Sequence, residues 1–320
     1  MAVYTAVSDE AAQALLERYD IGALVKLTGI EQGVENSNYF LETSQGRFIL
    51  TIYEKRVDPA DLPFFLGLLE HLTGRGFPSP RPVKTKAGAL MSDFAGKPAA
   101  IVTFLAGKSH TKLSVSRCAA LGEALARLHL AAQGFAIDRP NDLGMADWPG
   151  LYAASKARAD EVAPGLGTMI EHELQRLQQA WPQDLPFGVI HADLFPDNVF
   201  FIGTKVSGFI DFYFGCQDFL SYDIAICLNA WCFEPDGQFN ITKARALLRR
   251  YEDVRPLTSD EISALPVLAA GAAMRFLLTR LHDWLHPVEG ALVQPKDPLE
   301  YVQKLRFHSS INHPEAYGLG

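Results

Sequence analysis

The feature that most limits the fold is the order of the local patterns along the chain. Strand-like segments fill most of the first 104 residues, with a helical segment inserted among them at 62–76. From Ser114 onward apolar residues recur with the helical period of 3.6, and one β segment at 187–212 interrupts them. Strands and helices that are segregated in this way are typical of α+β proteins and not of alternating βαβ units. We therefore expect a small antiparallel sheet with one inserted helix, followed by a larger, mainly helical region.

A boundary between two lobes is expected at residues 104 and 105, where LAGKSH breaks the strand pattern with small and polar residues. The lobe formed by 1–104 begins with a helix that Ser8 can cap, ahead of Asp9 and Glu10. Its strands are expected at 23–30, 38–43, 47–54, 89–94 and 98–104. The lobe formed by 105–320 is expected to contain helices at 116–132, 153–159, 169–181, 219–231, 241–253, 259–285 and 298–307, and a hairpin that turns at 203–205.

Composition excludes several classes of protein. The formal net charge is −8 and Lys and Arg do not cluster, which argues against a nucleic-acid binder. Four scattered cysteines form no CxxC pair and are expected to be reduced. The N-terminus does not resemble a signal peptide, and the longest apolar run, ALPVLAAGAAMRFLL, is cut by Arg275 and falls short of a membrane span. We expect a cytoplasmic protein that acts on small molecules and contacts no membrane.

A polar cluster lies between strand-forming residues in VIHADLFPDNVFF, at 189–201. Because buried unpaired carboxylates are costly, this segment is either an ordinary surface loop or the floor of an active site. The spacing His191-x-Asp193-x-x-x-x-Asn198 matches the catalytic loop of protein-kinase-like phosphotransferases. The hairpin that follows leads to Asp211 in IDFYFG, where those enzymes keep the aspartate of D-F-G. A lone HxD is a weak signal, whereas the two parts together are specific.

These side chains suit phosphoryl transfer. Mg²⁺ prefers oxygen ligands, and Asn198 and Asp211, on either side of one hairpin, can supply them beside the phosphates of ATP. Asp193 is expected to orient the acceptor hydroxyl and to take its proton. His191 is expected to shape the loop through hydrogen bonds. Asp197 is interpreted as a turn former only.

Segments along nearly the whole chain resemble the aminoglycoside-phosphotransferase-like branch of the kinase superfamily, and within it the bacterial homoserine kinases. These segments are GVENSNYFLET, GRFILTIYEKRV, ARLHLAA, VIHADLFPDNVFF, FIDFYFGC, YDIAICLNAWCF, RFLLTRLHDW and KDPLEYVQKLRFH. The resemblance implies a bilobal protein-kinase-like fold and ATP-dependent phosphorylation of the side-chain hydroxyl of L-homoserine, a step in threonine biosynthesis. It also implies that Asp223 is structural and ties the catalytic loop to the helical lobe. His129 has apolar neighbours at helical spacing and is interpreted as a core histidine.

The resemblance places the nucleotide between the lobes. In the loop EQGVENSN, Gly33 allows close approach of the backbone to the phosphates, and Asn36, Ser37 and nearby N–H groups can donate to them. In the linker TFLAG, Thr103 and Leu105 would offer backbone groups to the adenine edge.

One position departs from the family pattern. Thr51 stands on the third strand where kinase-like folds usually keep a lysine for the α- and β-phosphates. Lys55, a lysine from another strand, or magnesium together with backbone donors could replace that contact. The usual glutamate partner is equally open, with Glu70 as the one glutamate in the inserted helix.

A site for homoserine needs a cation for the carboxylate and an acceptor for the ammonium group. Arg275 and Arg280 are candidates because a guanidinium can hold a carboxylate through two parallel hydrogen bonds. They are five positions apart and turned away from each other on a helix, so one site is not expected to use both. A surface salt bridge is an equal alternative for each. Trp231 could form a wall of the pocket or could pack between helices.

Other functions remain open from the sequence. A kinase of choline, methylthioribose or an aminoglycoside would share the fold, because the fold does not determine the substrate. A metal-dependent hydrolase would use His191, Asp193 and Asp211 as ligands. A silent nucleotide-binding module is the alternative that the absent strand lysine suggests. No pattern in the sequence indicates an oligomeric state.

Overall fold

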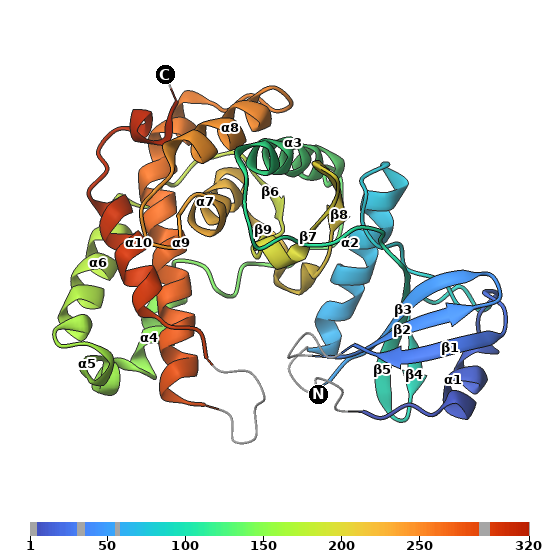
Figure 1. The fold of residues 1–320 in the computed structure, drawn as a ribbon. Helices are drawn as coiled ribbons and strands as arrows, with labels where there is room; N and C mark the ends of the chain where they lie inside the picture. Colours follow the sequence, from blue (N-terminus) through green and yellow to red (C-terminus); the bar gives the residue numbers. More distant parts are fainter. Residues whose placement is uncertain (1–4, 31–35, 55–57, 288–294, 320) are drawn as a thin grey trace.

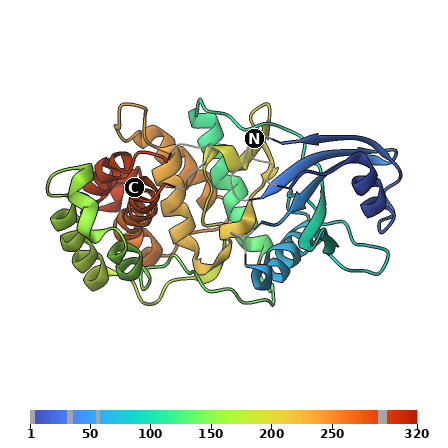
Figure 2. The same ribbon diagram turned by 90° about the horizontal axis from the view of Figure 1, so that it is seen from below.

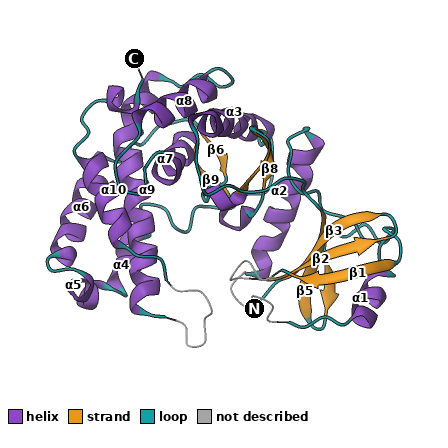
Figure 3. Ribbon diagram, in the orientation of Figure 1, coloured by secondary structure: helices purple, strands orange, loops and turns teal. Residues whose placement is uncertain are grey.

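The computed structural model describes residues 5–30, 36–54, 58–287 and 295–319, and in it the two patterns of the sequence separate in space (Figure 1). The strands of the N-terminal third form a sheet at one end of the molecule, and the helices from α3 onward form the other end (Figure 3). The view from below shows the same separation (Figure 2). The expected bilobal α+β architecture is therefore confirmed, while the division at residues 104 and 105 stays a prediction.

The N-terminal sheet has five antiparallel strands in the order β1-β2-β3-β5-β4. They are β1 Leu24–Gly29, β2 Ser37–Thr43, β3 Gly46–Ile52, β4 Ser92–Phe94 and β5 Lys97–Thr103. Helix α1 (Asp9–Leu16) covers one face, and its Leu15 joins Leu41 and Leu50 in a small core. The Ser8 side chain accepts a hydrogen bond from the N–H of Ala11, so the predicted cap is confirmed.

The inserted helix, α2 (Leu62–Gly74), follows a single 3-10 turn at Pro59–Asp61. Asp58 caps that turn by accepting from the N–H of Ala60 at 2.9 Å, and Pro59 follows it in the first turn, where its missing N–H is not needed. The buried side chains of α2, including Phe64 and Phe65, belong to the large core of the helical lobe and not to the small core of the sheet. Helix α2 therefore packs the two lobes against each other.

The helical lobe consists of α3 Val115–Ala131, α4 Trp148–Ala153, α5 Ala159–Val162, α6 Leu166–Ala180, α7 Leu220–Trp231, α8 Ile241–Glu252, α9 Ser259–Leu285 and α10 Leu299–Ser309. The helix expected at 153–159 was wrong. Helix α4 begins earlier, with Pro149 in its first turn and the buried Trp148 donating its indole N–H to Leu143 O at 2.9 Å, and it ends at Ala153. Helices α3 and α8 can approach closely because Gly122 has no side chain. A Cβ at this position would overlap the carbonyl oxygen of Leu247.

Helix α9 is the central element of this lobe and packs against α4, α6, α7 and α10. It begins with a capping box in which Thr258 and Glu261 bond each other's backbone N–H groups. By length and composition α9 could cross a membrane, so the expectation that no such segment is long enough was wrong. However, 72% of its most apolar window is buried inside the protein, as in the core helix of a globular lobe.

Two short antiparallel pairs interrupt the helices. Strand β6 (Phe187–Ile190) pairs with β9 (Cys216–Phe219), and β7 (Val199–Ile202) pairs with β8 (Lys205–Phe209) across a turn at 203–204. The β7–β8 hairpin was expected from the sequence and β9 was not. Pairing of Ile190 with Cys216 brings the residues that follow β6 next to those that precede β9. The two parts of the polar motif are thereby placed side by side.

Candidate active site

The catalytic loop leaves β6 in an unusual backbone conformation. Ala192 has a φ of 61°, in the left-handed region that side-chain-bearing residues rarely adopt. The buried carboxylate of Asp223 on α7 accepts from the N–H of His191 at 2.8 Å and from the N–H of Ala192 at 3.0 Å. Asp223 therefore ties the loop to the helical lobe, as predicted.

Asp223 is in turn held by His129 on α3. The His129 Nε2 lies 3.2 Å from the Asp223 carboxylate, and its Nδ1 lies 2.7 Å from the Tyr251 hydroxyl. Burial by itself raises the pKa of Asp223, but the bond from His129 and the charges and N–H group beside it together lower that pKa below its ordinary value. Asp223 is therefore ionised, and the interpretation of His129 as a core histidine with satisfied hydrogen bonds is confirmed.

His191 connects the loop to the segment that carries Asp211. Its Nε2 lies 2.9 Å from Ile210 O, and its Nδ1 accepts from the N–H of Asp193 at 3.3 Å. Because a carbonyl oxygen can only accept, Nε2 carries the proton and the ring is neutral. Burial lowers the pKa of His191 and favours this neutral form. The arrangement agrees with the expected role in shaping the loop.

Asp193 and Asn198 contact each other directly. The Asn198 side-chain amide donates to Asp193 O at 2.8 Å and to its carboxylate at 3.1 Å. Burial raises the pKa of Asp193 to about 8, while the positive charge of Arg275 opposes that shift. The Asn198 Oδ1 accepts no hydrogen bond from the described residues. Asp197 lies exposed in the 3-10 turn between them, as expected of a turn former.

Asp211 lies beside this pair. The preceding residue, Ile210, donates its N–H to Asn198 O at 3.0 Å, and Asp211 itself has a left-handed backbone with a φ of 63°. Its negative charge helps to raise the pKa of Asp193, so the two carboxyl groups face one region. The structure thus brings Asp193, Asn198 and Asp211 together. One amide oxygen and one carboxylate suit a hard cation whose remaining ligands come from phosphates and water.

A larger protein-built metal site is not formed in the described ranges. No group of three or more His, Cys, Asp and Glu side chains is arranged there to hold a metal ion. His191 uses both ring nitrogens for hydrogen bonds within the loop. The donor set therefore matches a nucleotide-completed site better than a zinc site.

Of the residues expected near the phosphates, Gly33 lies outside the described residues. Asn36 is buried, and its Oδ1 accepts from the N–H of Glu54 at 3.3 Å. Ser37 is fully buried, and its hydroxyl donates to the Glu54 carboxylate at 2.7 Å. Both side chains thus anchor the start of β2 to the residue that follows β3.

The linker residues differ in what they can offer to a base. Thr103 donates its N–H to Arg81 O at 2.9 Å, and its hydroxyl accepts from the N–H of Arg81 at 2.9 Å. Leu105 packs beside Gly208. A Cβ on Gly208 would overlap the methyl groups of Leu105. The N–H and carbonyl of Leu105 make no hydrogen bond within the described part of the chain. Leu105 is therefore the better placed of the two for an adenine contact.

Thr51 occupies the strand position of the absent lysine, and a hydroxyl cluster surrounds it. Its hydroxyl donates to Asn38 Oδ1 at 2.7 Å and is a hydrogen-bonding neighbour of Tyr213. Tyr213, which follows Asp211 by two residues, lies with its hydroxyl oxygen 3.5 Å from that of Tyr53. Sequence reasoning missed Tyr213, although its place beside the motif aspartate was a signal that could have identified it.

The lysines and glutamates considered as replacements lie elsewhere. Lys55 lies outside the described residues. Lys97, at the start of β5, pairs with Glu54, and Glu70 pairs with Lys84 on the surface. The Lys97–Glu54 pair lies just beyond the end of β3, whereas Thr51 itself contacts Asn38 and Tyr213.

The three residues expected to bind the acceptor do not share one site. Trp231 is fully buried and donates its indole N–H to Leu194 O at 2.7 Å, which favours the packing alternative. Arg280 pairs with Glu300 on α10 at 2.6 Å and stacks over Tyr301. Arg275 is buried beside the catalytic loop.

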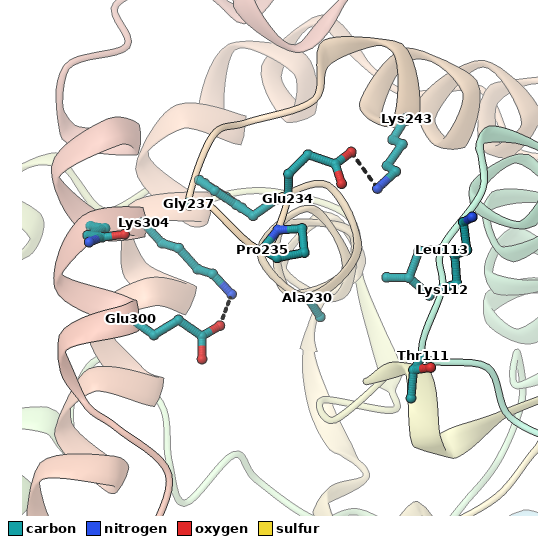
Figure 4. Close-up of a pocket in the computed structure, with 12 residues that line it drawn as sticks. Thr111, Lys112, Leu113, Ala230, Glu234, Pro235, Gly237, Lys243, Glu300 and Lys304 are labelled. Atoms are coloured by element: carbon teal, nitrogen blue, oxygen red, sulfur yellow. Dashed lines mark hydrogen bonds and ion pairs between the residues drawn. The ribbon is translucent and has the colours of Figure 1, made fainter.

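A charged pocket of about 510 Å³ lies between α10, the end of α7, the start of α8 and the segment 111–113 that precedes α3 (Figure 4). Two lysine–glutamate pairs line it, Lys304–Glu300 and Lys243–Glu234, each with a nitrogen-to-oxygen distance of 2.6 Å. The other lining residues are Thr111, Lys112, Leu113, Ala230, Phe233, Pro235, Gly237 and Gln303. The sequence did not indicate this pocket because its walls come from distant segments.

Two contacts place this pocket close to the catalytic loop. Ala230 lines the pocket, and the next residue, Trp231, is the one that bonds Leu194 O. Tyr301, next to Glu300 on α10, interacts electrostatically with the Asp193 carboxyl. Asp193, Asn198 and Asp211 are not themselves among the residues that line the pocket.

Comparison with known proteins identifies the family. Residues 26–257 match the model of the phosphotransferase enzyme family. The homoserine kinases of Xanthobacter autotrophicus and Rhodospirillum rubrum are each 58% identical to this chain over 319 residues, which is 100% of this chain and 99% of each relative.

Solved structures at lower identity show the same fold. An aminoglycoside phosphotransferase from Alicyclobacillus acidocaldarius superposes with a TM-score of 0.69 at 15% identity, covering 98% of this chain and 94% of its own. Amicoumacin kinase, in complex with AMP-PNP, Ca²⁺ and Ami, gives a TM-score of 0.69 at 16% identity over 98% and 94%. With the family match and the close relatives, these likenesses lead to one conclusion: the chain belongs to the phosphotransferase enzyme family and, within it, to the homoserine kinases.

Proposed function

We propose that this protein transfers the γ-phosphate of ATP to the side-chain hydroxyl of L-homoserine, in the cytoplasm, as a step in threonine biosynthesis. The observation that carries the proposal is the convergence of Asp193, Asn198 and Asp211 at one loop. The close relatives named homoserine kinase supply the identity of the acceptor.

Asp193 orients the acceptor hydroxyl and takes its proton as the phosphoryl group is transferred. The Asn198 amide bonds the carboxylate, and the ring Nδ1 of His191 accepts from the backbone N–H of Asp193, so the two contacts fix the direction of the carboxylate. Positioning of this kind lets the protein contribute to phosphoryl transfer without forming a covalent intermediate.

Asn198 Oδ1 and the Asp211 carboxylate are the groups that would hold a divalent cation, with Mg²⁺ as the expected ion. When bound, Mg²⁺ neutralises charge on the nucleotide phosphates. The loop that contains Gly33, Asn36 and Ser37 would cover the phosphates with backbone N–H groups, and Leu105 would meet the adenine edge.

The charged pocket is the proposed acceptor site. Homoserine carries one carboxylate and one ammonium group, and the Lys304–Glu300 pair offers the opposite charge to each. Arg280 contributes indirectly, because it holds the second oxygen of Glu300 at 2.6 Å. Glu300 is next to Tyr301 on α10, and the charge of Asp193 acts on Tyr301. This neighbour favours the Lys304–Glu300 pair over the Lys243–Glu234 pair as the site for homoserine.

The experiment that tests the proposal is a coupled assay of ADP release with ATP, Mg²⁺ and a panel of acceptors. Homoserine comes first, with choline, methylthioribose and an aminoglycoside beside it. We expect strong stimulation by homoserine alone. Stimulation by another acceptor and not by homoserine would overturn the substrate and keep the reaction class.

Two alternatives are less well supported. A hydrolase that uses His191 as a metal ligand would have to break the bonds of that ring to Ile210 and Asp193. A silent module would not need Asp193 and Asn198 held in contact beside Asp211. Tightly bound zinc in the purified protein would support the first, and absence of ATP turnover with every acceptor would support the second.

A further inference from the structure

Arg275 is a buried cation that no acidic side chain neutralises directly. It lies on α9, and only 2% of its surface is exposed. Across the described ranges no Asp or Glu forms an ion pair with its guanidinium. Taking a charge out of water without a close counter-ion costs several kcal/mol, on the order of the estimates for single buried ions. A residue kept under these conditions needs a role that compensates for the cost.

Two contacts of the Arg275 guanidinium lead to the catalytic loop and to the segment that follows Asp211. Its Nη1 donates to the carbonyl oxygen of Ala192, the middle residue of the His191-x-Asp193 motif. Its guanidinium carbon lies 4.6 Å from the ring centre of Phe276 and 5.6 Å from that of Phe214, which follows Asp211 by three residues. Its Nε is buried and has no hydrogen-bond partner.

The bond to Ala192 fixes a strained peptide. Ala192 has a φ of 61°, a conformation in which the Cβ of a residue with a side chain lies too close to the following carbonyl oxygen. The N–H of Ala192 is held by Asp223 and its carbonyl by Arg275. The N–H belongs to the peptide between His191 and Ala192, and the carbonyl belongs to the peptide between Ala192 and Asp193, so the two bonds fix the peptide planes on both sides of Ala192.

We propose that Arg275 is a positioning residue that holds the left-handed turn at Ala192 and thereby aims Asp193, and that it does not bind the carboxylate of the acceptor. This role rests on the proposed phosphoryl transfer. The acceptor carboxylate is left to the separate pocket on α10.

The test is a double-mutant cycle between Arg275→Met and Ala192→Gly, read as kcat and as the KM for homoserine. Arg275→Met removes the bond and the charge while keeping an unbranched apolar side chain. We expect kcat to fall about 10- to 100-fold, in line with a loss of about 1–3 kcal/mol of backbone positioning, and KM to change less than twofold.

The glycine variant separates positioning from binding. Glycine adopts a positive φ without the penalty that alanine meets, so the turn should depend less on Arg275 when residue 192 is glycine. The fold loss in kcat caused by Arg275→Met should then be smaller in the Ala192→Gly background than in the wild type. An equal or larger loss, or a rise in KM with kcat retained, would overturn the proposal.

Arg275→Lys keeps the test decisive if the methionine variant does not fold. Lysine retains the charge and can reach fewer acceptors in a fixed geometry. We expect a smaller loss in kcat than with methionine, again reduced by Ala192→Gly, with the melting temperature and nucleotide binding measured for each variant. If the wild type does not phosphorylate homoserine, the proposed function fails first, and the cycle is run with whichever acceptor is turned over.

Discussion

The side-chain amide of Asn198 bonds both the backbone oxygen of Asp193, at 2.8 Å, and its carboxylate, at 3.1 Å. One residue thus fixes the main chain and the side chain of the other. The Oδ1 proposed to bind the cation belongs to the same amide group. The positions of the proposed proton acceptor and the proposed metal ligand therefore depend on each other.

Asp193→Asn should abolish phosphoryl transfer and leave nucleotide binding nearly intact. The amide has the same shape and cannot take the proton of the acceptor hydroxyl, so kcat should fall by at least about 10²- to 10⁴-fold. The measurements are the coupled kinase assay and calorimetric titration with ATP and Mg²⁺. Asp197→Asn is the matched control, since Asp197 is exposed four residues away. Turnover like the wild type in the Asp193 variant would refute the mechanism.

Asp211→Ala should weaken binding of the metal–nucleotide complex itself. This carboxylate is one of two protein groups proposed to hold the cation, so its loss should raise the Mg²⁺ concentration needed for half-maximal nucleotide binding by tenfold or more, as an order of magnitude. Binding of a fluorescent ATP analogue at increasing Mg²⁺ gives this value without turnover. An unchanged Mg²⁺ dependence would show that Asp211 is not a ligand.

Thr51→Val should destabilise the sheet end of the interface between the lobes. Valine keeps the shape of threonine but removes the bond to Asn38 Oδ1 and leaves the Tyr213 hydroxyl with Tyr53 alone. Buried groups left unpaired cost about 1–3 kcal/mol of unfolding free energy, which urea denaturation can measure. Thr51→Ser retains the hydroxyl and should cost less. Equal stability of both variants would mean that the hydroxyl cluster is not important.

Lys304→Met should raise the KM for homoserine at least about tenfold and change the KM for ATP little. The lysine is buried in the pocket wall, and a lost charge-assisted bond to a carboxylate corresponds to about 1.5–3 kcal/mol. Lys156→Met is the control, because Lys156 forms a comparable pair with Glu171 on the surface. If both variants gave wild-type values of KM for homoserine, the acceptor would bind elsewhere.

His308 should make the fold more sensitive to acid. Burial lowers the pKa of His308 to about 3 in the folded protein, against about 6.5 in the unfolded chain. Above pH 6.5 the histidine is neutral in both the folded and the unfolded state, so it does not lower the free energy of unfolding there. As the pH falls from there toward 3, the unfolded state binds a proton that the folded state does not, and about 1.4 kcal/mol of unfolding free energy is lost per pH unit.

His308→Gln should remove this slope. The difference in unfolding free energy between wild type and variant should shrink as the pH falls from 6.5 to 4, while exposed His172→Gln should follow the wild type. Urea denaturation at several pH values measures all three proteins. Parallel curves for wild type and the His308 variant would contradict the assignment.

Local signals were enough to predict most elements and the core of the candidate site. Ser8 and Thr258 are N-caps whose partners lie three residues away, and the helical period carries α9 without help from distant residues. The spacing of Asp193 and Asn198 is equally local, because one 3-10 turn connects them.

Features that depend on pairing between distant residues could not be read in the same way. Strand β9 has four residues, and its partner β6 lies more than two dozen positions earlier, so no local period identifies it. Alternation in β2 could not tell which face Ser37 would take, and that face turned out to be the buried one. The helical period separates Arg275 from Arg280, but only the packing around α9 shows what each one contacts.

The two arginines of α9 diverge by about 140° around the helix axis, as five residues at 100° each require. One serves the loop that performs the transfer, and the other supports the wall that α10 contributes to the pocket. Substitutions confined to α10 could therefore change which alcohol is accepted and leave the catalytic loop, which Arg275 contacts, unchanged. Because α9 separates the catalytic loop from the pocket wall, a protein with this fold could change its substrate without altering the residues that transfer the phosphoryl group.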